Sequence, residues 1–247
     1  MTTNTEDEAL SVWEHLLELR NYLYYTLAAL LVGGTVTHIY HEKILTMLFA
    51  PLKGQPLVFL SPLDPILFIL KIDFYGALAI ALPVIFFCFF RFIAPALGSR
   101  GSLFVSSFLL FSTLLIIAAS IYTCLLLIPL SINFLLSVQV PGVENFFTAD
   151  RYLSFIFMQL MLMIGIFQIP CVIALLTLTK LLNPRLLTKN RGIVYVVTTI
   201  ALSILTPTTD IFSVCLFLIP TLVIFELSVL LAKAIYWIGT RSNSFHA

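Results

Sequence analysis

The sequence has few charged residues and contains no basic or Arg-rich block. Only 10% of its 247 residues are charged, 60% are hydrophobic, and the formal net charge is +1. A water-soluble domain carries roughly a quarter charged residues, so this composition excludes one and indicates a chain surrounded by lipid. The missing basic block argues against nucleic acid as a partner.

Groupings of cysteine and histidine that bind metals or perform catalysis are also missing. The cysteines lie in four different apolar runs, which favours neither disulfides nor zinc: Cys88, Cys124, Cys171 and Cys215. The histidines form no i, i+4 pair and no H-E-x-x-H setting, and no P-loop, dinucleotide fingerprint or G-x-S-x-G motif is present. We therefore expect no enzyme, no cofactor and no metal site.

The first 21 residues form a polar segment before the first apolar run. Its acidic start is the opposite of the basic region of a cleavable signal, so we expect the first run to be retained. Ser11 and Glu14 form the S-x-x-E pattern of a capping box, which predicts an amphipathic helix beginning at Ser11. Glu14 and Glu18 are four residues apart and share one face of that helix.

Six apolar runs are long enough, or nearly so, to span a bilayer core, which needs about 20 helical residues. We predict an all-α integral membrane protein with one domain, residues 1–247, and a tail at 233–247. The predicted spans are 22–40, 66–92, 103–128, 152–179, 193–205 and 211–232.

The distribution of Lys and Arg predicts that both termini lie in the cytoplasm. With six spans, most basic residues then fall inside: Arg20, Arg91, Arg100, Lys180, Arg185, Lys189, Arg191, Lys233 and Arg241. The outside connections hold fewer: Lys43, Lys53, Lys71 and Arg151. Residues 1–21 and 233–247 are therefore predicted to be cytoplasmic.

Prolines and short connections add detail to this plan. The prolines of His41–Pro65 exclude a continuous helix there and predict an ordered cap. The fifth run, 193–205, is too short to span a bilayer core easily. Thr206–Asp210 predicts a tight hairpin. Three prolines within spans predict bends unless neighbouring groups compensate: Pro83, Pro170 and Pro220.

Polar residues inside the spans need either a structural or a functional explanation. Gln168 either bonds a carbonyl freed by the Pro170 kink or forms a polar spot that meets a substrate or partner helix. Glu226 is either a hydrogen-bonded contact between helices or part of a functional path. Asp210 directly precedes the sixth run, so we expect it to cap that helix.

Several motifs resemble the TatC family, the six-span receptor subunits of the twin-arginine protein translocase. They occur in the family's order along almost the whole chain: EHLLELR at 14–20, APL at 50–52, LSPLDPILFILK at 60–71, ALPVIFFCFFRFIAPAL at 81–97, FQIP at 167–170 and LTPTTDIFS at 205–213. The resemblance implies six tilted, partly kinked helices in a curved, glove-like wall.

The resemblance also implies a function. Such a protein binds signal peptides of folded precursors at the cytoplasmic face and recruits single-span TatA/TatB-type subunits, within a homo-oligomeric receptor complex in the cell inner membrane or an organellar membrane. The signal-peptide contacts implied are Glu18, Arg20, Phe92 and Pro95, with Glu14 a further candidate. Gln168 is implied to face a concave pocket, and Pro51 and Asp210 to belong to the outer face.

The sequence departs from the family pattern in the first cytoplasmic loop. Family members carry a glutamate shortly after the F-I-A-P-A-L run, whereas this loop reads GSRGS at 98–102, with Gly101 at about that position. Because carboxylates recognise guanidinium groups best, we hypothesise that recognition is shifted onto the N-terminal segment, above all Glu18.

Two other classes of function remain open. A secondary transporter or channel could use Gln168 and Glu226 along a path through kinked spans, although no repeat symmetry is present. An assembly scaffold without a transport role is the other alternative.

Overall fold

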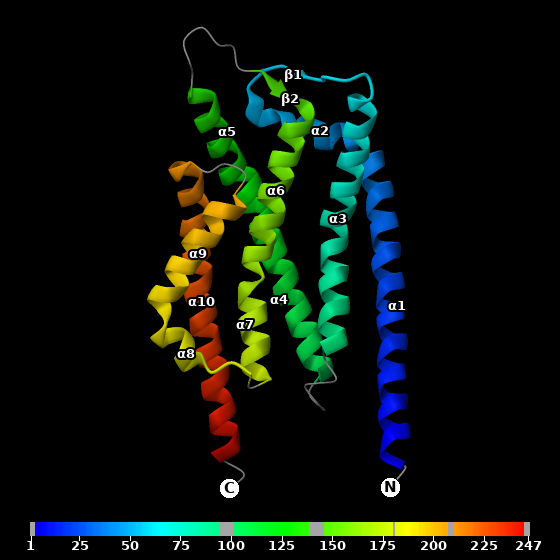
Figure 1. Cartoon of the computed structure of the whole chain (residues 1–247), viewed down its shortest axis with the longest axis vertical. Coiled ribbons are helices and arrows are strands. Elements are labelled where there is room, and N and C mark those ends of the chain that lie inside the picture. The colour runs from blue at the N-terminus through cyan, green and yellow to red at the C-terminus, as the bar shows by residue number, and fades with distance from the viewer. Residues whose placement is uncertain (1–2, 94–100, 139–145, 180, 207–209, 245–247) are drawn as a thin grey trace. The chain divides into compact units, whose positions relative to one another are not determined.

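The computed structural model describes the backbone of residues 3–93, 101–138, 146–179, 181–206 and 210–244. Side chains are described for 17–92, 106–138, 146–179, 181–206 and 210–237. The described chain is helical apart from two short strands (Figure 1). It divides into unit 1, residues 1–45 and 69–109, and unit 2, residues 46–68 and 110–247.

Unit 1 contains α1 (Thr3–Ile39) and most of α3 (Asp64–Ile93), and two further helices begin or end in it, α2 (His41–Phe49) and α4 (Gly101–Tyr122). Small residues let α1 and α3 approach closely. A Cβ atom on Gly33 would lie 2.9 Å from the carbonyl oxygen of Ala77, and one on Gly76 would lie 2.4 Å from Cγ2 of Thr37. Close backbone approach through small residues is a common way to pair helices in membranes.

The start of α1 corrects one sequence prediction. The helix begins at Thr3 and continues through Ser11, so the expected N-terminus at Ser11 is wrong. Residues 6–10 read EDEAL, which combines good helix formers with acidic residues that are favourable near a helix N-terminus. These residues favour helix upstream of Ser11, so the helix begins before the S-x-x-E pattern.

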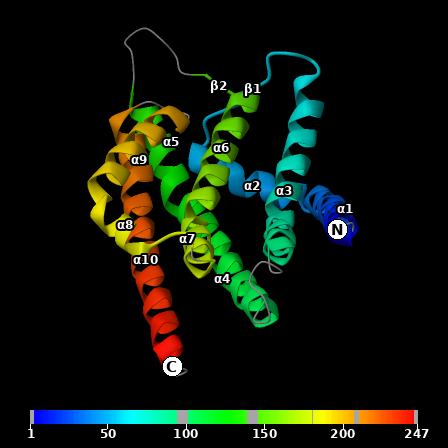
Figure 2. The ribbon, with the colours of Figure 1, turned by 60° about the horizontal axis from the view of Figure 1, so that its bottom comes forward.

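Unit 2 holds the remaining elements. They are η1 (Ala50–Leu52), β1 (Leu57–Val58), a π-helical turn η3 (Thr123–Leu127), α5 (Ile128–Ser137), β2 (Phe147–Thr148), α6 (Ala149–Phe167), α7 (Ile169–Leu178), α8 (Pro184–Lys189), α9 (Arg191–Leu205) and α10 (Ile211–Ser244). The two strands pair in parallel, Leu57 opposite Phe147 and Val58 opposite Thr148. Both α8 and α9 lie beside α10 (Figures 1 and 2).

Two apolar clusters form the core of unit 2. One joins η1, α5 and α6 through Leu52, Ile128, Ile132, Tyr152 and Ile156. The other joins α7 to α10 through Ile173, Phe225, Val229 and Ala232, and side chains of α8 and α9 pack against it. The hydroxyl of Tyr152 also donates to the carbonyl of Leu48, 2.5 Å away.

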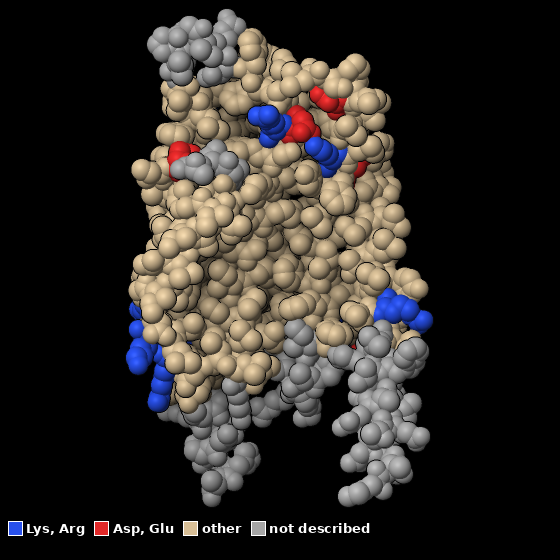
Figure 3. Space-filling view, viewed as in Figure 1, with Lys and Arg blue, Asp and Glu red and all other residues tan. Residues whose placement is uncertain are grey.

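Five described helical stretches are long and apolar enough to cross a membrane. They are Leu17–Ile39, Asp64–Phe92, Ser106–Ser137, Ala149–Leu178 and Ile211–Trp237. The fifth predicted run is α9, which has only 15 residues and is shorter than these, as its sequence predicted. On the face drawn in Figure 3, few Lys, Arg, Asp and Glu side chains are visible, and most of the described surface is tan, the colour of all other residues.

The prolines within the predicted spans do not all interrupt their helices. The helices α3 and α10 continue through Pro83 and Pro220, whereas the fourth run breaks at Gln168, just before Pro170. The third run continues to Ser137 and not only to Ile128, because the π-helical turn η3 accommodates Pro129 at the start of α5. As expected, the segment His41–Pro65 is not one continuous helix, but it contains the helix α2, which the sequence did not predict.

Candidate functional site

Unit 1 brings an acidic, an aromatic and a basic group together at one end of its helix pair. The ring of Tyr22 on α1 meets that of Phe92 on α3 edge to face, with centroids 6.5 Å apart. Glu18 lies one turn before Tyr22, and both Glu18 and Arg91 are close enough to act electrostatically on the Tyr22 hydroxyl. The predicted residues Glu18 and Phe92 therefore lie around one half-buried tyrosine.

The charge at this end is not strongly acidic. Among the described side chains here, Glu18 is exposed, and the guanidinium groups of Arg20 and Arg91 are exposed as well. Arg20 is two positions from Glu18, about 200° around the helix, so it does not share the face of Glu18. The predicted contacts Glu14, whose side chain is not described, and Pro95 lie outside the described part.

Gln168 is buried and bonded to another helix of unit 2. Its side chain is only 4% exposed, its Oε1 accepts from the Ser112 hydroxyl at 2.9 Å, and its Nε2 donates to the Ser112 carbonyl at 3.3 Å. The amide thus contacts α4 and not a carbonyl of its own kinked helix. With both ends of the amide occupied, Gln168 joins two spans.

Glu226 is also held between helices. Its Oε1 accepts a hydrogen bond from the Tyr195 hydroxyl on α9, and Nη1 of Arg191 lies 3.3 Å from its Oε2. Arg191 and Tyr195 are four residues apart, so both reach Glu226 from one face of α9. The carboxylate therefore links the short helix α9 to α10, which matches the structural interpretation of this residue.

Asp210 and Pro51 occupy the ends of elements in unit 2. Oδ2 of Asp210 accepts from the backbone N–H of Ser213 at 2.7 Å, which confirms the predicted cap of α10. Pro51 lies in η1, next to Leu52, which is 2% exposed and belongs to the core cluster. The hairpin predicted at Thr206–Asp210 includes residues 207–209, which lie outside the described part.

Sequence reasoning missed the partners of several site residues. Tyr22, Arg91, Ser112 and Tyr195 were not singled out, although Arg191 and Tyr195 show a usable signal, a polar pair at helical spacing within an apolar run.

In the described part of the chain, no group of three or more His, Cys, Asp or Glu side chains could hold a metal ion. Fold and site together define a multi-span helical membrane protein.

Comparison with known proteins identifies the family. The model of the Sec-independent protein translocase protein (TatC) family matches residues 14–220, so the chain belongs to the TatC family. The TatC protein of Aquifex aeolicus is 31% identical over 89% of this chain and 93% of its own length. That of Escherichia coli is 29% identical over 93% of this chain and 90% of its own.

A solved structure supports the same assignment. The crystal structure of the twin-arginine translocase receptor TatC in the detergent DDM has a TM-score of 0.76 and 28% sequence identity, covering 88% of this chain and 99% of that one. The chain is therefore a membrane component of Sec-independent protein translocation.

Proposed function

We propose that this chain is the receptor subunit of a twin-arginine translocase. It binds the signal peptides of folded precursors at the cytoplasmic face of the inner membrane. In this proposal it forms one domain with six spans, α9 being the fifth, and both termini are cytoplasmic. It also assembles with further copies and with single-span subunits of the TatA/TatB type.

The observation that carries the proposal is the convergence of Glu18, Tyr22 and Phe92 at one end of unit 1. A carboxylate next to aromatic rings suits a peptide that offers guanidinium groups and apolar side chains. A hydrogen bond to a charged group contributes about 1.5 to 3 kcal/mol, so Glu18 is the main source of selectivity for arginine. Phe92 and Tyr22 form the apolar support, and Glu14 and Pro95 extend the site.

Arg91 adds positive charge to this site. Its guanidinium lies near the same tyrosine and repels a cationic peptide, while the first cytoplasmic loop lacks the family's glutamate. We infer that the site binds the arginine pair more weakly than a fully acidic one.

Recruitment of single-span subunits has support of a different kind. In the span Leu17–Ile39 only 11% of the most apolar window is buried within the chain, which leaves apolar surface for lipid or a partner helix. Gln168 and Glu226 are each engaged by another helix of unit 2, so they would contact a partner only after those bonds open. These bonds give the transporter alternative no support.

Binding of a synthetic twin-arginine signal peptide to the purified protein in nanodiscs tests the receptor proposal. We expect Glu18→Gln to weaken binding roughly tenfold, the value of one charge-assisted hydrogen bond. Arg91→Gln should strengthen it, because it removes a repulsive charge. Glu42→Gln makes the same charge change in α2 and serves as the control. Unchanged binding in both Glu18→Gln and Arg91→Gln would refute the site.

A further inference from the structure

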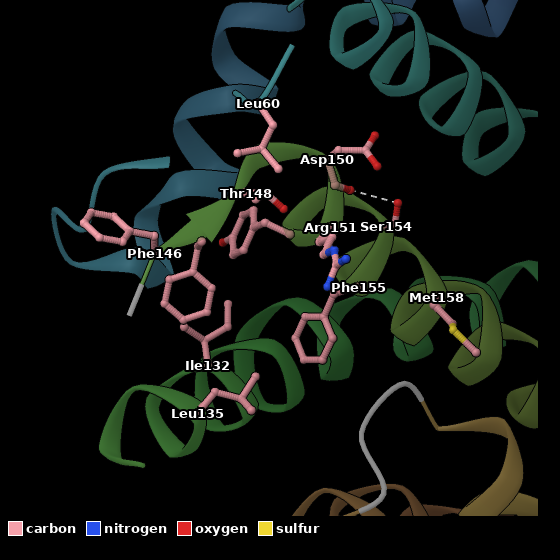
Figure 4. Close-up of a pocket in the computed structure, with 12 residues that line it drawn as sticks. Leu60, Ile132, Leu135, Phe146, Thr148, Asp150, Arg151, Ser154, Phe155 and Met158 are labelled. Atoms are coloured by element: carbon pink, nitrogen blue, oxygen red, sulfur yellow. Dashed lines mark hydrogen bonds between the residues drawn. The ribbon is translucent and has the colours of Figure 1, made fainter. Parts of the chain in front are cut away.

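Unit 2 also contains a cavity, whose lining shares Ile132 and Tyr152 with the first apolar cluster. It holds about 870 Å³ and lies between the end of α5 and the start of α6, with Leu60 from the segment after β1 at one side (Figure 4). Cavities for small molecules generally hold about 300 to 1,000 Å³. Several lining residues are exposed, among them Leu60 at 78%, Phe146 at 64% and Met158 at 45%, so the cavity opens at the surface.

The wall of the cavity is mainly apolar and made of large side chains. Ile132 and Leu135 project from α5 toward Phe155 of α6, and Met158 continues the wall one turn further along (Figure 4). Packing of a second transmembrane helix favours small residues that let backbones approach, whereas most of this wall consists of Leu, Ile, Phe, Tyr and Met side chains, with Thr148 and Ser154 as its small residues. Large flexible and aromatic side chains suit a hydrocarbon chain better.

The polar groups of the cavity lie at its end near the start of α6. Arg151 lies one helical turn before Phe155 on the same face of α6, and no described residue forms a hydrogen bond or ion pair with its guanidinium. Thr148 is the N-cap of α6 but its side chain makes no capping bond, and its Oγ1 is buried without a partner. The free N–H groups of a helix start and a guanidinium both favour an anion.

One acidic group also lines the cavity. The Asp150 carboxylate points away from Phe155 and Leu135 in Figure 4, and Asp150 has interactions of its own. The Ser154 hydroxyl donates to the Asp150 carbonyl at 2.9 Å. The remaining polar groups therefore favour negative charge at the mouth of an apolar cavity.

The cavity lies at the ends of two candidate membrane spans. Its lining includes the first residues of the span Ala149–Leu178 and residues near the end of the span Ser106–Ser137. We propose that it binds an anionic phospholipid, with the phosphate at Arg151 and the start of α6 and an acyl chain along Ile132, Leu135 and Phe155. The proposal does not depend on signal-peptide binding.

Native mass spectrometry of the delipidated full chain tests this site. The protein is titrated with phosphatidylglycerol and, separately, with phosphatidylcholine of identical acyl chains. We expect phosphatidylglycerol to bind more tightly, and Arg151→Gln to reduce that binding roughly tenfold, the loss of one charge-assisted contact. Arg185→Gln, the same substitution in α8, should leave it unchanged. Met158→Trp fills the apolar part and should reduce the binding of both lipids.

Other outcomes would overturn the proposal. Equal binding of the two lipids, or no effect of Arg151→Gln and Met158→Trp in variants whose unfolding temperature is unchanged, would contradict it. Full competition by inorganic phosphate would mean an anion site without a lipid chain. A photo-crosslinker at position 158 that captures a single-span subunit instead of lipid would assign the cavity to a protein partner.

Discussion

The helices of unit 1 and unit 2 are held together by different means. In unit 1, α1 and α3 meet through Gly33, Gly76 and Ala77, and a polar bond 2.8 Å long joins His38 to Asp73. In unit 2, polar side chains join helix to helix, as Gln168 joins Ser112 and Glu226 joins Tyr195. Close backbone approach is thus a feature of the α1–α3 pair, and side-chain hydrogen bonds join the spans of unit 2.

The two units also differ in how much of a membrane span is buried within the chain. Only 11% of the most apolar window of Leu17–Ile39 is buried within the chain, against 61% for Ala149–Leu178. A bonded, buried helix set suits a fixed scaffold, whereas a helix with a largely uncovered surface suits contact with lipid, partners or cargo. This difference agrees with the placement of the proposed receptor site in unit 1.

The largest expected effect comes from separating α1 from α3. Gly33→Leu places side-chain atoms where a Cβ alone would already lie 2.9 Å from the Ala77 carbonyl oxygen. The backbone of Ala77 cannot move aside as a flexible side chain can. We therefore expect a loss of about 3 kcal/mol in the free energy of unfolding, at the upper end of the usual cost of overpacking. Thermal and denaturant unfolding in detergent would measure it.

Gly165→Leu is the matched control for that variant. A Cβ on Gly165 meets nothing within 4 Å, so the same substitution in α6 should cost little. Equal destabilisation by the two variants would show that α1 and α3 do not depend on close approach.

A second, smaller effect should follow from removing the carboxylate that joins α9 to α10. Glu226→Ala removes the acceptor for Tyr195 and the partner of Arg191, so we expect a loss of about 2 kcal/mol in the free energy of unfolding. Tyr195→Phe should lose less, since the ion pair remains. A double-mutant cycle that gives no coupling between positions 195 and 226 would contradict the role assigned to this bond.

The smallest effect concerns Gln168. Gln168→Leu leaves the Ser112 hydroxyl without its acceptor inside the protein, and we expect a loss of about 1 kcal/mol, typical of hydrogen bonds between membrane helices. The double variant Gln168→Leu with Ser112→Ala should recover most of that loss, because neither buried group is then unsatisfied. If the double variant were less stable than both single ones, the pair would not explain the burial of Gln168.

Much of the fold could be predicted from hydrophobic runs, because a span needs a certain length of apolar helix whatever its neighbours. The runs at 66–92 and 211–232 correspond to spans in α3 and α10, and the shortness of α9 was visible in its sequence. Local chemistry also sufficed for the cap at Asp210, since cap and helix are adjacent.

Contacts between distant residues could not be predicted in the same way. Gln168 and Ser112 are 56 positions apart, and Tyr195 and Glu226 are 31 apart, so helix periodicity carries no information about their pairing. The pairing of Leu57 with Phe147 joins two strands of two residues, too short for a periodic signal. The start of α1 at Thr3 has no local signal as clear as the capping-box pattern at Ser11, and that pattern lies inside the helix.

Site-specific photo-crosslinking tests the central claim, that a twin-arginine signal peptide is recognised around Glu18, Tyr22 and Phe92. A crosslinker at position 22 or 92 is exposed to a labelled precursor, and one at Leu230, an exposed apolar residue of α10, is the control. We predict crosslinks from positions 22 and 92 that are lost when the arginine pair is replaced by lysines, and none from position 230. Crosslinks from position 230 alone, or from neither of the other two positions, would contradict the account.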